Sequence, residues 1–307
     1  MKKISIKRIK KTLASVIFTS VTLIVLLLVF VGKDSSFSIS DLFGTNQKHI
    51  EERRLSDDFI RFMDVGQGDA ALISSNGNCA IIDAGPSVAG TALASKLYSC
   101  DVEKLDAALI THFHEDHYGG LEYINAAFPI KNLLIPDMNK TEENTDEIRR
   151  ISGKVELAGG RVYTMIEGVN FSVGDFAVTV IGYYPDLAEE NNRSVFAMAE
   201  MDGIKFLFTG DAEKEAEYRI IEKSVDIDCD VLKVGHHGSS SSSTAKFLKS
   251  ASPDYCVISV GLGNQYSHPN DSVLARFEKE KMKVYRTDLQ GDITFNINDG
   301  EINVLTN

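Results

Sequence analysis

Three histidines and one aspartate lie within six residues, directly after a short apolar segment at 106–111. The run reads His112-Phe113-His114-Glu115-Asp116-His117. Alternate side chains of an extended segment share a face, so His112 and His114 are expected to point to one side, while Asp116 and His117 turn toward a second point. Imidazole and carboxylate ligands together suit Zn²⁺ best, with Mn²⁺ or iron as alternatives. The run therefore predicts ligands for two divalent metal ions.

Four ligands are too few for two metal ions, and the other candidates also follow apolar segments. Asp211 ends a Thr-Gly-Asp motif after the segment at 204–208, and its alternative role is to cap a helix that begins at Ala212. His236 and His237 follow the segment at 231–234, and His268 lies beyond the segment at 255–260. Six of the seven histidines thus lie where strands are expected to end, which predicts one site assembled from distant segments.

Short apolar segments bounded by turn residues predict strands, and longer segments between them predict helices. Strands are expected within 59–74, 79–84, 106–111, 132–136, 161–166, 171–183, 194–201, 204–208, 230–234, 255–260, 283–287 and 293–297. Helices are expected at 91–99, 118–128, 142–157, 212–223, 244–250 and 272–281. Strand-rich blocks interleaved with helices in two similar halves predict an α+β fold, with two sheets packed face to face and helices on their outer faces.

The first 57 residues read as a membrane anchor and a stalk. Residues 1–11 are basic, and 12–32 carry no charge and are rich in Val, Ile, Leu and Phe. About 20 apolar residues cross a bilayer as a helix, and the basic flank is expected to stay in the cytoplasm. A cleavable signal peptide is the alternative, but its apolar region is usually shorter. We therefore expect a single-pass cell-membrane protein with a polar stalk at 33–57 and an extracytoplasmic domain at 58–307.

The charge of the chain is unevenly distributed. Residues 1–33 carry seven Lys and Arg and no acidic residue, so 34–307 carry 25 basic and 44 acidic residues, a net charge of −19. Such a domain repels polyanions at long range, although a bound cation attracts an anionic group locally. An anionic ester is therefore the expected substrate and DNA is disfavoured. The sequence indicates no obligate protein partner.

Four cysteines lie in or beside apolar segments, at Cys79, Cys100, Cys229 and Cys256. None has the C-x-x-C spacing of a zinc–thiolate site. Buried thiols are the favoured interpretation. A disulfide between Cys79 and Cys100 is the alternative, because an extracytoplasmic domain permits one.

The motif His-x-His-x-Asp-His followed by Gly119-Gly120, and then Thr-Gly-Asp at 209–211, resembles the metallo-β-lactamase superfamily over about residues 58–300. This resemblance implies a four-layer αβ/βα sandwich. Five further motifs are similar to the hydrolase domain of ComEC/Rec2-type DNA-uptake proteins, and phosphorylcholine esterases of the Gram-positive surface are similar too. These motifs are Phe-Met-Asp-Val-Gly-Gln-Gly-Asp at 62–69, Ile-Asp-Ala-Gly at 82–85, Val-Gly-His-His-Gly-Ser at 234–239, Tyr-Ser-His-Pro at 266–269 and Tyr-Arg-Thr-Asp at 285–288.

The sequence departs from many superfamily members at 189–194, where they supply another histidine ligand and this chain has none. In the resembling branch that ligand comes from the His-His-Gly motif. The resemblance then implies one metal on His112, His114 and His236, a second on Asp116, His117 and His268, and Asp211 as the bridge. His237 is the weaker choice as a ligand. It is expected to form a hydrogen bond beside the metals and, with Asp116, is a candidate catalytic residue.

Five polar residues are candidates to support this site. Asp64, Asp69 and Asp83 could orient ligand histidines, and hydrogen bonds within turns and loops are the alternative. Arg286 could meet a substrate phosphate, and an ion pair within the protein is its alternative. Asn264 could contact substrate, or it could cap a loop.

These features predict a dinuclear metal-dependent hydrolase, of phosphodiesterase or nuclease type, that uses a metal-bridging hydroxide. One alternative is a phosphorylcholine-type esterase or another hydrolase of small surface substrates. A second alternative is a non-catalytic metal-binding module. Structural zinc sites usually have four protein ligands per ion, whereas seven ligands shared by two ions leave positions open for water and substrate, which favours an enzyme.

Overall fold

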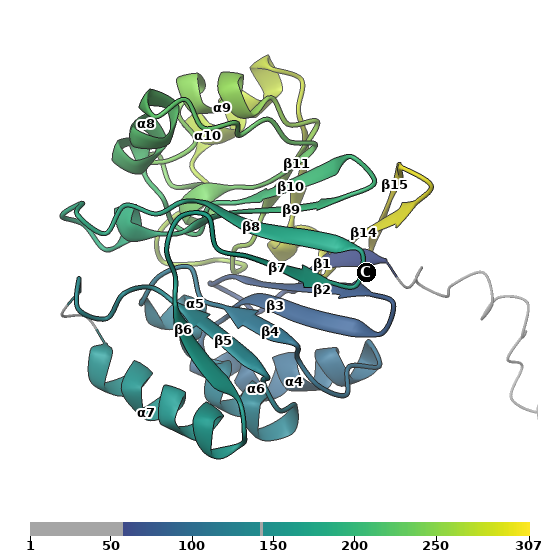
Figure 1. The fold of residues 1–307 in the computed structure, drawn as a ribbon. Helices are drawn as coiled ribbons and strands as arrows, with labels where there is room; N and C mark the ends of the chain where they lie inside the picture. The colour runs from purple at the N-terminus through teal and green to yellow at the C-terminus, as the bar shows by residue number, and fades with distance from the viewer. Residues whose placement is uncertain (1–57, 142–143) are drawn as a thin grey trace, which may run out of the picture. The chain divides into compact units, whose positions relative to one another are not determined.

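Two β-sheets lie face to face in the computed structural model, which describes residues 58–141 and 144–307 (Figure 1). The first sheet has the strand order β15-β14-β1-β2-β3-β4-β5-β6. It is mixed, because β1 to β3 pair antiparallel and β3 to β6 pair parallel. Its strands are β1 (Phe59–Phe62), β2 (Ala70–Ser75), β3 (Asn78–Ala84), β4 (Ala107–Leu109), β5 (Asn132–Ile135), β6 (Arg161–Thr164), β14 (Ile293–Asn298) and β15 (Glu301–Thr306).

The second sheet has the order β13-β12-β11-β10-β9-β8-β7 and is also mixed. Its strands β7 to β10 pair antiparallel, and β10 to β13 pair parallel. Both sheets therefore contain parallel strands whose carboxyl ends carry loops. The strands are β7 (Asn170–Val173), β8 (Phe176–Gly182), β9 (Phe196–Met201), β10 (Ile204–Phe208), β11 (Val231–Lys233), β12 (Tyr255–Ile258) and β13 (Lys283–Arg286).

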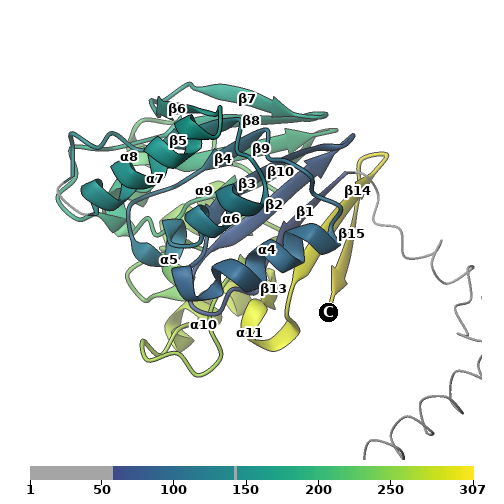
Figure 2. The same ribbon diagram turned by 90° about the horizontal axis from the view of Figure 1, so that it is seen from below.

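Helices cover the outer face of each sheet and give four layers (Figures 1 and 2). The first sheet is covered by α4 (Gly90–Ser99), α6 (Leu121–Ala127) and α7 (Thr145–Leu157), and the second by α8 (Lys214–Glu222), α9 (Ala245–Ala251) and α10 (Asp271–Lys279). Shorter elements are α5 (Glu115–Tyr118), α11 (Thr287–Gln290), η1 (Ser87–Ala89), η2 (Asn191–Arg193) and η3 (Gly235–Gly238). The predicted α+β sandwich of two sheets is confirmed.

Apolar residues fill the three spaces between the layers. Between the sheets, the ring of Phe62 lies 5.8 Å from the rings of both Phe208 and Phe295. A second cluster lies between the first sheet and its helices, and a third between the second sheet and its helices. The central strands are therefore buried on both faces, which explains their nearly continuous apolar sequences.

Two segments expected to be strands are each divided by a turn. The segment 59–74 forms β1 and β2, separated by a loop in which Gly66 and Gly68 have φ values of +75° and +143°. The segment 171–183 forms β7 and β8, with Gly174 at φ +57° between them. Glycine adopts these conformations without the steric cost that other residues have. The expected helix at 118–128 becomes α5 and α6, and β15 was not predicted.

The predicted membrane helix at 12–32 and the stalk at 33–57 lie outside the described residues. Within the part of the chain that the structure describes, no helix combines the length and apolar character needed to span a bilayer. All four cysteines are free thiols. The alternative of a Cys79–Cys100 disulfide was therefore wrong, and Cys100 Sγ instead accepts a hydrogen bond from Arg61 Nη1 at 3.1 Å.

Candidate metal centre

The histidine run forms the loop after β4 and ends in α5. Its side chains therefore lie among the loops that follow the carboxyl ends of strands in both sheets. His112 and His117 are completely buried, whereas His114 is half-buried. Ligand atoms of His112, His114 and Asp211 lie within 4.8 Å of one another. Asp211 follows β10 of the second sheet, so this first group joins both halves of the fold.

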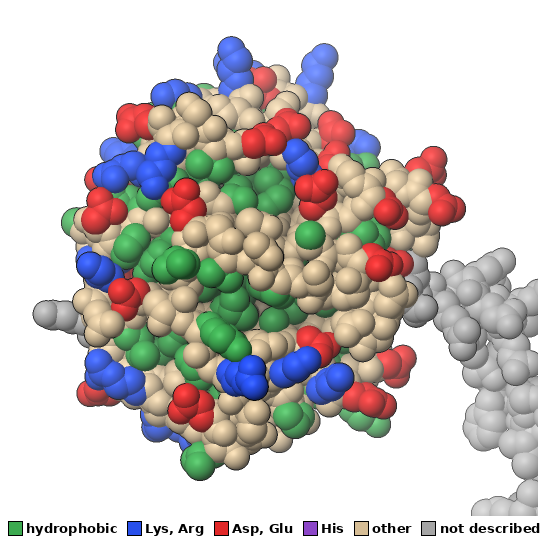
Figure 3. Space-filling model, viewed as in Figure 1, with side chains coloured by type: hydrophobic (Ala, Val, Ile, Leu, Met, Phe, Trp, Pro, Cys, Tyr) green, Lys and Arg blue, Asp and Glu red, His purple; other side chains and the backbone are tan. Residues whose placement is uncertain are grey.

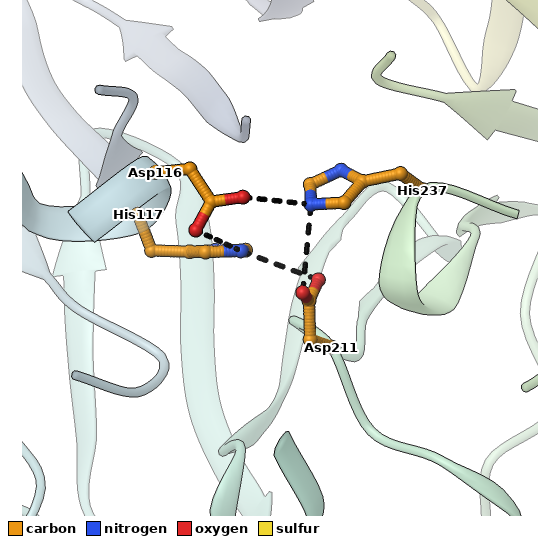
Figure 4. Close-up of side chains that lie close together, drawn as sticks. All are labelled: Asp116, His117, Asp211 and His237. Carbon is orange, nitrogen blue, oxygen red and sulfur yellow. Dashed lines mark hydrogen bonds and ion pairs between the residues drawn. The ribbon is translucent and has the colours of Figure 1, made fainter. Parts of the chain in front are cut away.

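A second group consists of Asp116, His117, Asp211 and His237, whose ligand atoms also lie within 4.8 Å of one another (Figure 4). His237 Nε2 is 3.2 Å from Asp116 Oδ2 and 3.4 Å from Asp211 Oδ2. His117 Nε2 is 3.2 Å from the other oxygen of Asp211, Oδ1. Asp211 is thus shared by the two groups. This is the position predicted for the bridging ligand.

The adjacent residues His236 and His237 have different surroundings. His236 was predicted to bind a metal and His237 to lie beside it, but His237 is the one that belongs to a ligand group. His236 Nδ1 lies 3.1 Å from Glu213 Oε1, and His236 Nε2 lies 3.8 Å from Asp211 Oδ2. His236 therefore lies at the edge of the cluster, held by a carboxylate on its outer side.

The backbone at this point is strained. His236 and His237 have φ values of +47° and +52°, in the left-handed region that costs most residues roughly 1–2 kcal/mol each. Strain of this kind is retained at functional sites when the surrounding structure holds it in place. Here it turns two consecutive imidazoles in different directions directly after β11.

The cluster has the composition and the unsatisfied atoms of a metal site. His117 Nε2 and Asp211 Oδ1 are buried and lie 3.2 Å apart, but within the described ranges neither atom has a partner with the geometry of a hydrogen bond. A buried polar atom without a partner is costly, and a divalent cation would satisfy both. Imidazole nitrogens and carboxylate oxygens are ligands of zinc, manganese and iron. The residues present therefore fit divalent metal ions.

His268 does not belong to either ligand group, although it was predicted to bind the second metal. Its ring centroid lies 5.5 Å from that of His236 and 6.5 Å from that of His237. Burial, followed by the neighbouring His236, lowers the pKa of His268 to about 4. His268 thus packs beside the cluster, and its Nδ1 is buried without a hydrogen-bond partner among the described residues.

Two of the three aspartates proposed to orient ligands contact histidines. Asp83 Oδ2 lies 2.8 Å from His117 Nδ1, and the same carboxylate accepts hydrogen bonds from the backbone and hydroxyl of Thr111 at 2.7 and 2.8 Å. Asp69 Oδ1 lies 3.3 Å from His237 Nδ1. Asp64 Oδ1 instead accepts a hydrogen bond from Gly66 N at 3.1 Å, within the loop after β1.

Burial and opposite charges set the ionisation of the cluster. Burial lowers the pKa of His112 well below its usual value. Burial would also lower the pKa of His117, but the carboxylates of Asp211 and Asp83 raise it well above that value. Burial would raise the pKa of Asp116, but His117 and the hydrogen bond with His237 bring it down to about 2. The cluster is therefore strongly polarised, as expected of a functional site.

The two residues predicted to contact substrate instead form hydrogen bonds with other groups of the protein. Asn264 Nδ2 donates to the carbonyl oxygens of Gly261 and His268 at 3.0 and 2.6 Å, so it caps the loop after β12. Arg286 forms two hydrogen bonds with the carboxylate of Asp288, at 3.0 and 2.6 Å. Neither contact involves the ligand groups.

Three charged residues that support the site were missed by the sequence analysis. Lys233 is buried, and its Nζ lies 2.5 Å from Asp69 Oδ2. Glu190 accepts a hydrogen bond from Phe113 N at 3.1 Å and so fixes the loop between the first two histidines. Glu213 holds His236. A lysine inside the apolar strand 231–234 is a signal that could have identified Lys233, because buried lysines are rare without a partner.

The chain is similar to known proteins in sequence and in fold. The family model for the metallo-beta-lactamase superfamily matches residues 63–261. The chain is 28% identical to ComE operon protein 3 of Bacillus subtilis over 77% of its own length, and it spans about a third (32%) of that protein. It is 24% identical to Endoribonuclease ysh-1 of Neurospora crassa, over 55% of this chain and 22% of that protein.

Among solved structures, a Zn²⁺-bound PqqB from Methylobacterium extorquens is similar in fold, with a TM-score of 0.55 and 11% sequence identity. The similarity covers 78% of this chain and all of that one (100%). The match of the family model extends over more than half of the chain and includes both ligand groups. The chain therefore belongs to the metallo-beta-lactamase superfamily.

Proposed function

We propose that the chain is a dinuclear metal-dependent hydrolase that cleaves phosphodiesters, of nuclease type. The observation that carries this proposal is the shared position of Asp211 in two groups of potential ligands. The carboxylate of Asp211 lies near imidazoles of both groups: its Oδ1 is 3.2 Å from His117 Nε2, and its Oδ2 is 4.0 Å from His112 Nε2 and 3.4 Å from His237 Nε2. Two divalent ions held by these residues would supply the chemistry of the two-metal sites found in phosphatases and nucleases.

Six residues would hold the metals. His112 and His114 with Asp211 form one site, and Asp116, His117 and His237 with Asp211 form the other. We therefore revise the assignment from the sequence, with His237 as a ligand and His236 beside the site. Bound at these positions, two divalent ions would lower the pKa of a water molecule and neutralise charge on the phosphate oxygens.

The other parts of the site position these ligands and handle protons. Asp83 fixes the ring of His117, and the carbonyl oxygen of Ser259, 2.9 Å from His237 Nδ1, fixes that of His237, with the charge of Asp69 beside it. Asp116 is the most accessible carboxylate of its group, with 31% of its side chain exposed. Its Oδ2 lies 3.2 Å from His237 Nε2, and its exposure makes it the carboxylate of this group that a reacting water can reach.

The choice of phosphodiesters rests on the relatives and on the chemistry of the cluster. One relative is named an endoribonuclease, and two divalent ions suit the displacement of an alkoxide from phosphorus. Residues 34–307 carry a net charge of −19, which does not favour long polyanions. On the face in Figure 3, basic side chains are interspersed with acidic ones. Short or single-stranded substrates fit this charge distribution better than duplex DNA does.

The proposed location rests on the sequence alone. The basic residues at 1–11 and the uncharged apolar run at 12–32 support a single membrane anchor with the hydrolase domain outside the cytoplasm. Carbonate extraction of membranes tests this, because it releases peripheral chains and leaves spanning ones. Recovery of the full-length chain in the soluble fraction would contradict the anchor.

The function is tested with His114→Ala and Asp211→Ala, measured on a generic phosphodiester together with bound metal. Both variants should lose metal and at least about a hundredfold in kcat/KM, because each removes a ligand. Asp226→Ala is the matched control, because Asp226 is an exposed carboxylate that pairs with Lys205 at 3.3 Å. Wild-type activity that survives exhaustive chelation would contradict the proposal.

A further inference from the structure

An exposed aromatic ring lies on the loop between β12 and α10, next to the cluster. Tyr266 is 58% exposed. Its ring is stacked on the ring of His268, with the centroids 5.8 Å apart and an angle of 26° between the planes. Inside the described ranges, no hydrogen bond of the Tyr266 hydroxyl is found. The outer face of this ring is therefore available to a flat ligand.

The stacked rings extend from the ligand cluster to the surface. His237, a member of the second group, lies 6.5 Å from His268 with an angle of 29° between the rings. His268 in turn stacks on Tyr266. Tyr266 is thus the solvent-facing end of a series of nearly parallel rings that begins at a candidate metal ligand. A ligand that binds the metals by a phosphate could place an attached ring on Tyr266.

The loop that carries Tyr266 is held in place by Asn264. The side-chain oxygen of Asn264 accepts hydrogen bonds from Tyr266 N and His268 N at 3.1 and 3.0 Å. Its nitrogen donates to the carbonyl oxygen of His268 at 2.6 Å. The position of the tyrosine is therefore set before any ligand binds, which reduces the entropy cost of stacking.

The start of the same loop packs against the segment next to Asp116. Gly261 N donates to Gln67 Oε1 at 3.2 Å, and a side chain at Gly261 would lie 2.7 Å from Gln67 N. A side chain at Gly68 would lie 2.4 Å from the carbonyl oxygen of Asp116. The loop is therefore fixed relative to the segment that contacts Asp116.

Two cationic side chains of the second sheet, on β11 and β13, are already paired. Lys233 is buried and forms an ion pair with Asp69, and Arg286 forms a bidentate ion pair with Asp288. The domain is also strongly acidic. Recognition of a phosphodiester beyond the metals therefore depends on contacts that do not require positive charge, and aromatic stacking is such a contact.

We propose that Tyr266 is a specificity residue that stacks on an unpaired nucleobase attached to the scissile phosphodiester. This inference rests on the proposed function and names its substrate class as single-stranded nucleic acid or a small nucleotide. The base must be unpaired because its neighbours in a duplex cover both faces. Every base offers a flat face, so the contact selects for the presence of a base and not for its identity.

The test uses two short single-stranded oligonucleotides that differ only in one position, which carries thymine in one and an abasic residue in the other. The wild type should bind and cleave the thymine-containing oligonucleotide roughly ten- to a hundredfold better. Tyr266→Ala should bring this ratio close to one, and Tyr266→Phe should keep it. Leu262→Ala should also keep it, because Leu262 is an exposed residue of the same loop that is outside the stack.

Affinity and cleavage are measured separately, so the two proposals can fail separately. An equal preference of the wild type for both oligonucleotides, or a preference that survives in Tyr266→Ala, would overturn the stacking role. A preference in affinity that depends on Tyr266, without cleavage of either oligonucleotide, would support the stacking role and contradict the hydrolase proposal.

Discussion

Asp69 and Lys233 form an ion pair directly behind His237, and both are almost completely buried. The amine of Lys233 also donates to the carbonyl oxygen of Val234 at 2.9 Å. Burial would raise the pKa of Asp69, but Lys233 and His237 lower it below its usual value, so the aspartate stays charged. At the scale of single residues, this lysine allows a carboxylate to remain ionised next to a metal ligand.

Replacing Lys233 by methionine should destabilise the protein by about 3–5 kcal/mol, because a buried charge is left without its partner. Urea-induced unfolding measures the change in the free energy of unfolding. The matched control is Lys205→Met, which breaks an exposed pair with Asp226 and should cost less than about 1 kcal/mol. If Lys233→Met also lowered the free energy of unfolding by less than about 1 kcal/mol, Asp69 would not be ionised in the folded protein.

At the scale of elements, α8 supports the serine-rich loop beside the cluster. Glu217 of α8 is buried, and its carboxylate accepts hydrogen bonds from Ser243 N at 2.5 Å and Thr244 N at 2.9 Å. Arg276 of α10 donates to the carbonyl oxygen of Ser243 at 2.6 Å. Burial raises the pKa of Glu217 from 4.5 to about 7, against the lowering effect of these hydrogen bonds.

Glu217 therefore makes stability depend on pH. Below pH 4.5 the group is protonated in both the folded and unfolded states, and its favourable contribution is complete. Between pH 4.5 and 7 only the unfolded state releases the proton, so stability decreases as the pH rises, by roughly 3 kcal/mol in total.

Glu217→Gln should remove this decrease, and Glu215→Gln, on the exposed side of the same helix, should not. The measurement is the free energy of unfolding in urea at several pH values. A difference between the wild type and Glu217→Gln that is constant from pH 4 to 8 would contradict the raised pKa.

At the scale of the whole molecule, the ligand cluster connects the two halves of the sandwich. The histidine run extends from the first sheet, whereas Asp211 and His237 follow β10 and β11 of the second. Metal ions bound here would hold these loops together, as well as supply chemistry. Binding to the folded state alone stabilises a protein in proportion to the logarithm of the free metal concentration.

Metal removal should accordingly lower the thermal stability. With free Zn²⁺ at about 100 times its Kd, the bound metal should add about 2.7 kcal/mol and raise the Tm by several degrees. Scanning calorimetry with and without a chelator measures the shift. Asp211→Ala should show almost no shift, because the shared ligand is lost. An equal shift in that variant would place the stabilising metal elsewhere.

Much of the fold and most of the candidate ligands were accessible from the sequence, because they depend on local patterns. Continuous apolar segments bounded by turn residues indicated the buried strands, and the spacing of His112, His114, Asp116 and His117 indicated metal ligands. The superfamily resemblance is confirmed by the family match. The turns at Gly66 and Gly174 were missed, since alternation continues across them and the sequence pattern does not reveal a positive φ.

The tertiary structure decided what local patterns leave open. His236 and His237 are adjacent and chemically identical, so which imidazole faces Asp211 depends on a left-handed backbone held by packing around η3. The partner of Lys233, Asp69, lies in the loop before β2 of the other sheet, and the stacking of Tyr266 on His268 requires the loop that Asn264 caps. Ligand type and spacing are properties of the chain, whereas the direction of a side chain is set by contacts between segments distant in sequence.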